Sequence, residues 1–570
     1  MYLKYIIRGV LYLKLYQKIY LGLSIFALSY NTCVAAPLSP DKYEQQQTAK
    51  RQIKEQEARI NAPAVKNEEK QILSSEVVLP KEKVKYKIDS FVIDDDNTGR
   101  FQWLLKDLKK YEHRRIGAKG ISTIMKYLQG RIMNRGFITT RILVPEQDIS
   151  SKQLVFKVRL GIIEDIKFAD EKKIGTAKNA FYSKSGDLLN IYDLDQGLEQ
   201  MKRVPRQDVK MKLLPGKETG KSVVMLDVNR ERFWSAGISW DDSGLYSTGK
   251  HQMTGDLAIY NPMNWNDILS VSYTNDTEND STLSSKNYSF YYSVPYGKYT
   301  FSVNHYRNEY EQDVPALVQY TQKGVTSTWD FGVQRLLYRN NSRKIQASAK
   351  IIHRHKQGYL NNEEVKVQEL QTTAYQLGLM QRQYVGAGTI DAMVYFQKGV
   401  PILGAMAGWD DFDPNYMTTR YNMWGFTFYY GIPFKMFEGN ARYSLTSRGQ
   451  FTEGMLYAVD QFSIGGRYSV KGFRGENSLS AENGFVVRNE LSFPIEKLNA
   501  EPYIGVDYGR VWGKSDEYNV GSKLAGAYIG IRGKIVNRLT YDGFVGTPIY
   551  KPEGFKAGKT ACGFNLYLQI

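Results

Sequence analysis

The sequence has few of the features that enzymes and helical membrane proteins need. Its 570 residues include only two cysteines, and its mean hydropathy of −0.45 leaves no apolar run long enough for membrane-spanning helices. Any insertion into a membrane must therefore use strands. The 42 tyrosines and 49 glycines fit this idea, because β-barrels use tyrosine girdles and close glycine packing around a polar interior.

Motifs for catalysis, nucleotide binding and metal binding also fail on inspection. Gly216–Ser222 imitates a phosphate-binding loop, but it has three residues between the glycines instead of four and precedes a predicted strand. Asp94–Gly99 imitates a calcium loop, but its twelfth position is Leu105, which has no carboxylate. His353 and His355 have no carboxylate or cysteine placed to complete a metal site. With no nucleophile elbow or catalytic triad either, we expect no enzyme activity, no cofactor and no metal.

The N-terminus has the layout of a secretory signal peptide. Four basic residues precede the apolar run 19–28, and small residues follow at Cys33–Ala36. We expect cleavage after Ala35, because cleavage one residue later would leave Pro37 first. A membrane anchor is the alternative, but the apolar run is short for a span of ~20 residues.

The positive charge does not indicate a nucleic-acid partner. Removing the four charges of the signal peptide from +17 leaves +13, with no interleaving of aromatic and basic residues typical of RNA-binding modules. Excess basic residues in a barrel protein line its loops and interior. Cys33 leaves with the signal peptide, so Cys562 has no partner for an intramolecular disulfide.

Residues 36–60 are predicted to contain a helix without an apolar face. The segment 42–60 is rich in helix formers but has no apolar stripe. Such a helix either lies as a solvated, partly disordered tail or plugs a polar barrel interior. Residues 61–83 are predicted to be a flexible linker.

Two small α/β modules follow, at residues 84–161 and 162–231. In the first, strands are expected at 86–93, 137–144 and 154–158 and helices at 101–108 and 121–132. In the second, a helix around 194–201 precedes a hairpin of strands 209–214 and 223–228. Their similarity predicts a repeated domain.

Residues 232–570 alternate between apolar and polar positions without helical periodicity. Strand, tight turn and strand units occur at 288–303, and the last strand ends at Ile570. The length fits roughly sixteen antiparallel strands of a transmembrane barrel. A soluble β-propeller is the rival fold, but no blade-length repeat is present.

A basic loop and an acidic strand within this region form the most informative pair. Gly505, Asp507 and Gly509 share one face of a predicted strand, whereas Ile504, Val506 and Tyr508 share the other. The glycines leave room beside Asp507, and an enclosed carboxylate requires a cation. We expect Lys471, in the loop 468–475, to supply it.

The chain resembles the two-partner secretion transporters, the TpsB family, which export haemolysins and filamentous adhesins. Residues 136–141 with 145–148 resemble the first POTRA domain of that family, and 189–201 with 203–205 resemble the second. The matching positions are Gly136, Thr139, Thr140, Arg141, Pro145, Gln147, Leu194, Gly197, Leu198, Val204 and Pro205.

The loop and strand also resemble family motifs. Val470, Lys471, Gly472 and Phe473 are similar to the Val-Arg-Gly-Phe/Tyr tip of the family's sixth extracellular loop, and 505–509 to its barrel-wall motif. Lysine replaces the family's arginine and cannot form a planar bidentate pair, so the contact is weaker or Arg474 shares the role.

The resemblance implies an outer-membrane transporter of a bacterium. It implies a sixteen-stranded barrel with an N-terminal helix in its pore, two periplasmic POTRA domains, and outward passage of an unfolded partner exoprotein recognised through its N-terminal secretion domain. Outer-membrane lipid, the barrel-assembly machinery and periplasmic chaperones are the further partners implied. The alternatives are a barrel-assembly insertase of the same superfamily and a general porin.

Overall fold

The computed structural model describes residues 40–63, 77–170, 174–278, 280, 282–314, 318–408, 416–436, 439–536 and 538–570. The predicted signal peptide lies outside the described residues, as does part of the predicted linker 61–83. Among the helices that the structure describes, none combines the length and apolar character needed to cross a membrane.

The first α/β module has two small sheets against two α-helices. Strand β2 pairs with β5 in parallel and β5 with β4 antiparallel, while β1 and β3 form a separate pair. The elements are β1 (Tyr86–Ile88), β2 (Ser90–Asp94), α3 (Leu104–Leu108), β3 (Arg114–Ile116), α4 (Ala118–Asn134), β4 (Arg141–Leu143) and β5 (Gln153–Arg159). The apolar face of α4 is buried on the sheet, as its spacing predicts, with Ile124, Leu128 and Ile132 fully enclosed.

Two predicted strands of this module differ from the observed ones. The strand expected at 86–93 divides at Asp89, because β1 pairs with β3 whereas β2 pairs with β5. The strand expected at 137–144 is only β4, because the preceding residues leave α4 through Gly136 at φ 95° and contact the second module. A positive φ of this kind favours glycine and ends a helix.

The second module repeats the helix-on-sheet plan. Its sheet has the order β6, β8, β7, and the β7–β8 hairpin turns where Gly216 N donates to Lys221 O at 2.9 Å. The elements are β6 (Ile162–Phe168), α5 (Ala177–Ala180), α6 (Ile191–Lys202), β7 (Gln207–Pro215) and β8 (Lys221–Arg230). The Asn190 side chain caps α6 by accepting from Tyr192 N.

Most of the described chain after residue 231 forms one closed antiparallel barrel, in which β27 pairs with β9. Sixteen strands make its wall, and the two-residue β16 (Glu363–Glu364) extends one hairpin. The sixteen are β9 (Trp234–Asp241), β10 (Gln252–Tyr260), β11 (Ile268–Asp276), β12 (Leu283–Tyr296), β13 (Tyr299–Val314), β14 (Tyr320–Arg339), β15 (Arg343–Leu360), β17 (Leu370–Val385), β18 (Gly388–Gly399), β19 (Asn422–Met436), β20 (Gly439–Thr452), β23 (Asn483–Ser492), β24 (Ala500–Trp512), β25 (Lys523–Val536), β26 (Leu539–Tyr550) and β27 (Ala561–Gln569).

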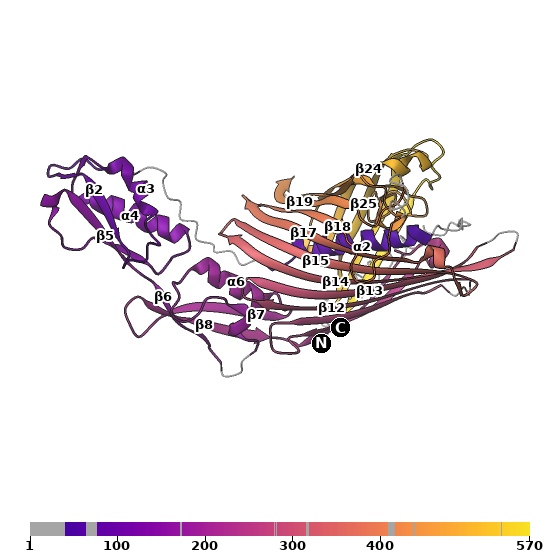
Figure 1. Ribbon diagram of the computed structural model, residues 1–570, viewed down its shortest axis with the longest axis horizontal. Coiled ribbons are helices and arrows are strands. Elements are labelled where there is room, and N and C mark those ends of the chain that lie inside the picture. Colours follow the sequence, from indigo (N-terminus) through magenta and orange to yellow (C-terminus); the bar gives the residue numbers. More distant parts are fainter. Residues whose placement is uncertain are drawn as a thin grey trace, which may run out of the picture.

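The parts lie in a row. Figure 1 shows the first module at the left, the second module next to the barrel, and helix α2 (Pro40–Ile60) among the barrel strands. Because strands alternate between faces, each contributes one set of side chains to the interior and one to the outside. Strand β24 has the alternation predicted for it, with Gly505, Asp507 and Gly509 buried and Ile504 and Val506 exposed.

Candidate transport pathway and its obstructions

The long loop between β20 and β23, residues 453–482, folds back into the barrel. It contains two short paired strands, β21 (Phe462–Ile464) and β22 (Leu479–Ala481). Its apolar residues join a buried cluster with side chains of the wall strands, including Val486, Val511 and Leu524. Val470 and Phe473, at the loop tip, are both buried in this cluster. The loop is therefore anchored by apolar burial as well as by its polar contacts.

Glycines allow the loop tip to approach the wall backbone. A Cβ at Gly526 of β25 would lie 1.9 Å from Lys471 O, and one at Gly472 would lie 2.6 Å from Thr547 O. Gly472 also has φ 107°, a conformation that favours glycine. On β24, Gly509 makes room for Val470, since a Cβ there would lie 3.0 Å from that side chain. Gly526 and Gly472 thus leave no space for a side chain, and Gly509 leaves little.

The structure brings Lys471 to Asp507, but through the main chain. Lys471 N donates to Asp507 Oδ2 at 2.9 Å, whereas the Lys471 ammonium lies 3.8 Å from Glu490 Oε2. The ion pair of Asp507 is with Arg488, whose Nε lies 3.5 Å from Asp507 Oδ2. The expected side-chain pair between Lys471 and Asp507 is thus corrected. Arg488 lies beside the carboxylate instead, because it is the register partner of Asp507 on β23.

Aromatic rings hold the Lys471 ammonium. Its Nζ lies 4.2 Å from the centroid of the Tyr528 ring and 5.2 Å and 5.3 Å from those of Tyr503 and Phe544. A cation at these distances is attracted to the ring faces. Gly505 makes room for the Tyr528 ring, since a Cβ there would lie 2.2 Å from it.

Arg474 does not share the role of Lys471. Its Nε donates to Thr560 O at 3.0 Å, near the segment between β26 and β27. Within the described residues, Asp507 Oδ1 accepts no hydrogen bond, although the side chain is fully buried. An arginine at position 471 has donors that could reach such an acceptor, whereas the ammonium observed there is held elsewhere.

Helix α2 lies inside the barrel and bonds to strands on opposite sides of it. Tyr43 Oη donates to Asn287 Oδ1 of β12 at 2.9 Å, and Gln56 Nε2 donates to Phe428 O of β19 at 3.1 Å. Arg448 of β20 donates to Gln52 Oε1 at 2.7 Å. Tyr43 is its largest buried side chain and packs on Tyr310, but most of its contacts are polar. The helix is thus held by the hydrogen bonds and ion pairs that its sequence permits.

A cavity of about 780 Å³ separates α2 from parts of the wall. Polar and charged side chains from α2, from β12 to β20 and from α6 contribute to its lining. Removal of the helix would therefore join an existing polar space to the space that the helix itself occupies. The arrangement is that of an obstructed, hydrophilic passage.

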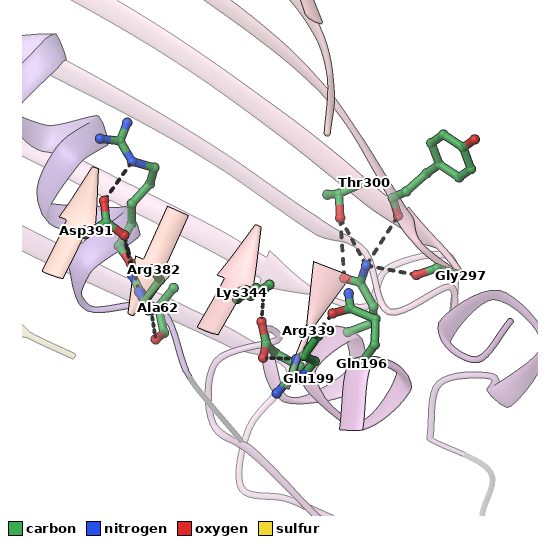
Figure 2. Close-up of polar contacts among 12 residues, drawn as sticks. Ala62, Gln196, Glu199, Gly297, Thr300, Arg339, Lys344, Arg382 and Asp391 are labelled. Atoms are coloured by element: carbon green, nitrogen blue, oxygen red, sulfur yellow. Dashed lines mark hydrogen bonds and ion pairs between the residues drawn. The ribbon is translucent and has the colours of Figure 1, made fainter. Parts of the chain in front are cut away.

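The C-terminal end of α2 is held beside strands β17 and β18. Arg382 of β17 donates to the main-chain oxygens of Arg59 and Ala62, at 3.2 Å for Ala62, and is ion-paired with Asp391 at 3.2 Å. Asp391 also accepts from Arg59 at 3.5 Å. Figure 2 shows Arg382 beside Asp391 and Ala62. Since the last carbonyls of a helix lack partners within the helix, Arg382 supplies donors that they need.

The second module docks on the barrel through helix α6. Glu199 pairs with Lys344 and with Arg339, which lies at 2.6 Å, on the two sides of the β14–β15 turn. Gln200 Nε2 donates to Gly297 O and to Thr300 Oγ1, both at 3.2 Å, in the β12–β13 turn region. Figure 2 shows both sets of contacts. Burial alone would raise the pKa of Glu199, but Lys344 and Arg339 outweigh it and lower this pKa to about 2.

The matched motif of the first module lies at the joint with the second. Asn190 Nδ2 donates to Arg135 O at 2.9 Å, and Gly161 N donates to Thr140 Oγ1 at 3.1 Å. A Cβ at Gly136 would lie 2.2 Å from Asn190 Oδ1. Thr139 packs against Gly161 in the same way, and a Cβ on that glycine would lie 2.1 Å from Thr139 Oγ1. These residues therefore fix how the two modules meet.

The other matched positions maintain the modules themselves. Gln147 both donates to Val155 O and accepts from Val155 N, which joins the loop after β4 to β5. Leu194 and Leu198 are buried in the core of the second module, and a Cβ at Gly197 would lie 2.2 Å from the Phe181 ring. Four positions remain. Arg141 and Pro145 form hydrogen bonds to residues close in sequence, Val204 is buried, and Pro205 is exposed. Their participation in substrate binding stays a prediction.

The sequence alone did not predict several residues that line or close the passage. Arg488 and Glu490 share the lumen face of β23, and Arg382, Asp391 and Glu199 hold the plug and the second module. For the four that lie on barrel strands, a charged residue in an alternating strand pattern was the available signal, because only lumen-facing positions tolerate charge at membrane depth.

Comparison with known proteins identifies the architecture. The family model described as haemolysin secretion/activation protein ShlB/FhaC/HecB matches residues 220–533. A ShlB-type POTRA domain matches 86–161, and a second POTRA domain matches 162–215. The outer membrane transporter CdiB-2 of Burkholderia pseudomallei is 35% identical over 560 residues, covering 95% of this chain and 96% of its own.

The chain belongs to the haemolysin secretion/activation family.

Two further relatives agree with this assignment. The hemolysin transporter protein ShlB of Serratia marcescens is 25% identical over 407 residues, with 70% of this chain and 71% of its own covered. The solved structure of CdiB from Acinetobacter baumannii, at 26% identity, superposes with a TM-score of 0.84 over 94% of this chain and 100% of its own. As a two-partner secretion transporter, the chain is an outer-membrane barrel with its POTRA domains in the periplasm. The TpsB resemblance and the sixteen-stranded fold are thus confirmed.

Proposed function

We propose that this transporter takes up an unfolded partner exoprotein through its POTRA pair and exports it through the barrel after helix α2 leaves the lumen. The observation that carries the proposal is the character of α2, whose contacts inside a polar barrel are mostly polar and can be exchanged for water. A helix with an apolar face buried on the wall would cost far more to remove. The partner is a haemolysin, an adhesin or a contact-dependent toxin, recognised by its N-terminal secretion domain.

Recognition at the POTRA pair requires an exposed sheet edge. In the second domain, β7 pairs with β8 on one side and forms an edge of the three-stranded sheet on the other. An unfolded segment can add to such an edge as a further strand, with main-chain hydrogen bonds that demand no fixed sequence. Lys212 on this edge strand is exposed and can report the contact.

Site-specific photo-cross-linking in the full chain tests this proposal. A photo-reactive residue at Lys212 should cross-link to the secretion domain of a partner exoprotein encoded beside the transporter gene. The matched control is Lys126, which is exposed on α4 and lies on no sheet edge. Equal cross-linking at both positions, or cross-linking to folded and unfolded partner alike, would count against strand addition.

A porin that only admits solutes is the second candidate, because the lumen is polar. It is disfavoured by the two POTRA domains, one of which is fastened to the barrel by Glu199 and Gln200. Solute flux without any export of a partner would decide for the porin.

A further inference from the structure

Strand β15 carries a row of cations along its lumen face. Lys344, Lys350, Arg354 and Lys356 stand at even-numbered positions, so they share one face of the strand. Lys344 lies at the periplasmic end beside the second POTRA domain, and Lys356 lies 12 residues further along, which is roughly 40 Å at about 3.3 Å per residue. The row therefore extends along most of the passage.

Each of these four cations is paired with a carboxylate that does not belong to the barrel wall. Lys350 lies 3.1 Å from Glu55, and Lys356 pairs with Asp41, both on helix α2. The other two partners are Asp460, at 2.7 Å from Arg354 in the long inserted loop, and Glu199 of the second POTRA domain. All four cationic side chains are at most 21% exposed, so they are enclosed.

Two other lumen cations, Arg488 and Arg532, differ in this respect. Arg488 pairs with Asp507, and Arg532 pairs with Glu490 and Glu501, all on neighbouring wall strands. These pairs persist when α2 leaves, whereas Lys350 and Lys356 lose their partners. Asp330 on β14 is the nearest wall carboxylate by strand register, but among the described residues it forms no ion pair with a cation of β15.

We propose that the lumen face of β15, at Lys350 and Lys356, is a binding track for carboxylate side chains of the exported chain, and that Glu55 and Asp41 of α2 occupy this track while the pore is closed. The inference rests on the proposed function, because it assumes that an unfolded chain follows the path vacated by α2. The class of ligand is indicated by the molecule itself, since carboxylates fill all four positions. A row of unpaired cations along the vacated passage attracts negative charge, so acidic segments of a passing chain would replace the departed groups.

Channel block by charged polypeptides tests the track. The full chain without residues 40–60 is reconstituted in planar bilayers, and poly-L-glutamate or poly-L-lysine is added on the POTRA side. Poly-L-glutamate should block the current, and the block should weaken at 1 M salt because charges are then screened. The double variant Lys350→Gln with Lys356→Gln, on the same deletion, should need about tenfold more poly-L-glutamate for half block.

Matched variants separate the track from general charge effects. Lys350→Arg with Lys356→Arg should retain the block, and Arg343→Gln, at an exposed position on the opposite face of β15, should leave it unchanged. Equal block of the double glutamine variant and its parent would overturn the proposal. Absence of any current from the deletion variant would overturn it too, because the track must line the path that α2 leaves. Neither measurement uses a partner exoprotein, so failure of the binding track can be distinguished from failure of the proposed export function.

Discussion

The two obstructions inside the barrel are held in different ways. The inserted loop places Lys471 O against Gly526 and buries Val470 and Phe473 in an apolar cluster. Helix α2 relies mainly on hydrogen bonds and ion pairs, such as those of Gln52 and Glu55. Apolar burial and close backbone packing are lost as a whole when a loop moves, whereas polar contacts can be replaced by water one at a time. The comparison supports the proposal that the helix is the movable plug, whereas the loop tip is packed into the wall.

Removal of the central carboxylate of the loop contact should have the largest effect. Asp507→Ala leaves Arg488 without its ion-pair partner and Lys471 N without its acceptor. Loss of one member of an enclosed pair costs roughly 3–5 kcal/mol, so we expect export to be abolished or sharply reduced while the barrel still inserts. Export of the partner exoprotein and outer-membrane levels are measured together.

Asp256→Ala is the control for this variant. Asp256 also faces the lumen, on β10, but its recorded contact is a hydrogen bond of 3.4 Å from Tyr567 Oη. Wild-type export by Asp507→Ala at normal membrane levels would show that the loop contact has no role in transport.

Deletion of the plug should have the next largest effect. Without residues 40–60, the polar cavity and the volume of the helix become one passage, and single-channel conductance in planar bilayers should rise severalfold. Arg382→Gln, which removes the donor to Arg59 O and Ala62 O, should give more frequent openings of the intact chain. An unchanged conductance after the deletion would refute the claim that α2 closes the pore.

Much of this arrangement could be predicted from the sequence. The period-2 pattern of residues 505–509 correctly predicted that Asp507 faces the barrel interior. The lack of an apolar stripe in α2 correctly predicted polar surroundings for this helix. The predicted partner of Asp507 was wrong, because strand register places Arg488 beside this carboxylate. Register across a hairpin depends on loop geometry, which the sequence does not reveal. The joint formed by Gly136 and Asn190 was missed for a similar reason, since it links two modules.

Docking of the second POTRA domain should be insensitive to mild acid. The pKa of Glu199 is about 2, below the ordinary value near 4.3, so its contribution is fully present above the ordinary pKa and is lost as pH falls towards 2. The distance between spin labels at Lys217 and Lys497, in a Cys562→Ser background, should be unchanged between pH 7 and pH 5.

Glu199→Gln sharpens this test. It removes the carboxylate that pairs with Arg339 and Lys344, so the distance distribution at pH 7 should broaden. A distribution for the variant that matches the wild type would show that other contacts, such as those of Gln200, dominate the docking.

The smallest effect is expected for Lys471→Arg. The guanidinium retains the attraction to the Tyr528 ring and can add a donor for Asp507 Oδ1, so export should be unchanged or slightly better and thermal stability equal or higher. Lys471→Gln, which removes the charge, is the control. A clear loss of export by Lys471→Arg would mean that the compact ammonium is required at this position.

Cross-linking of the plug to the wall tests the central claim most directly. In a Cys562→Ser background, Gln52→Cys and Arg448→Cys place two thiols where α2 and β20 are in contact. A short, cleavable thiol cross-linker between them should stop export of the partner exoprotein, and cleavage should restore it, while the single variant Gln52→Cys should be unaffected by the reagent. Export at an unchanged rate with the cross-link in place would contradict the account, because the helix could not then have left the passage.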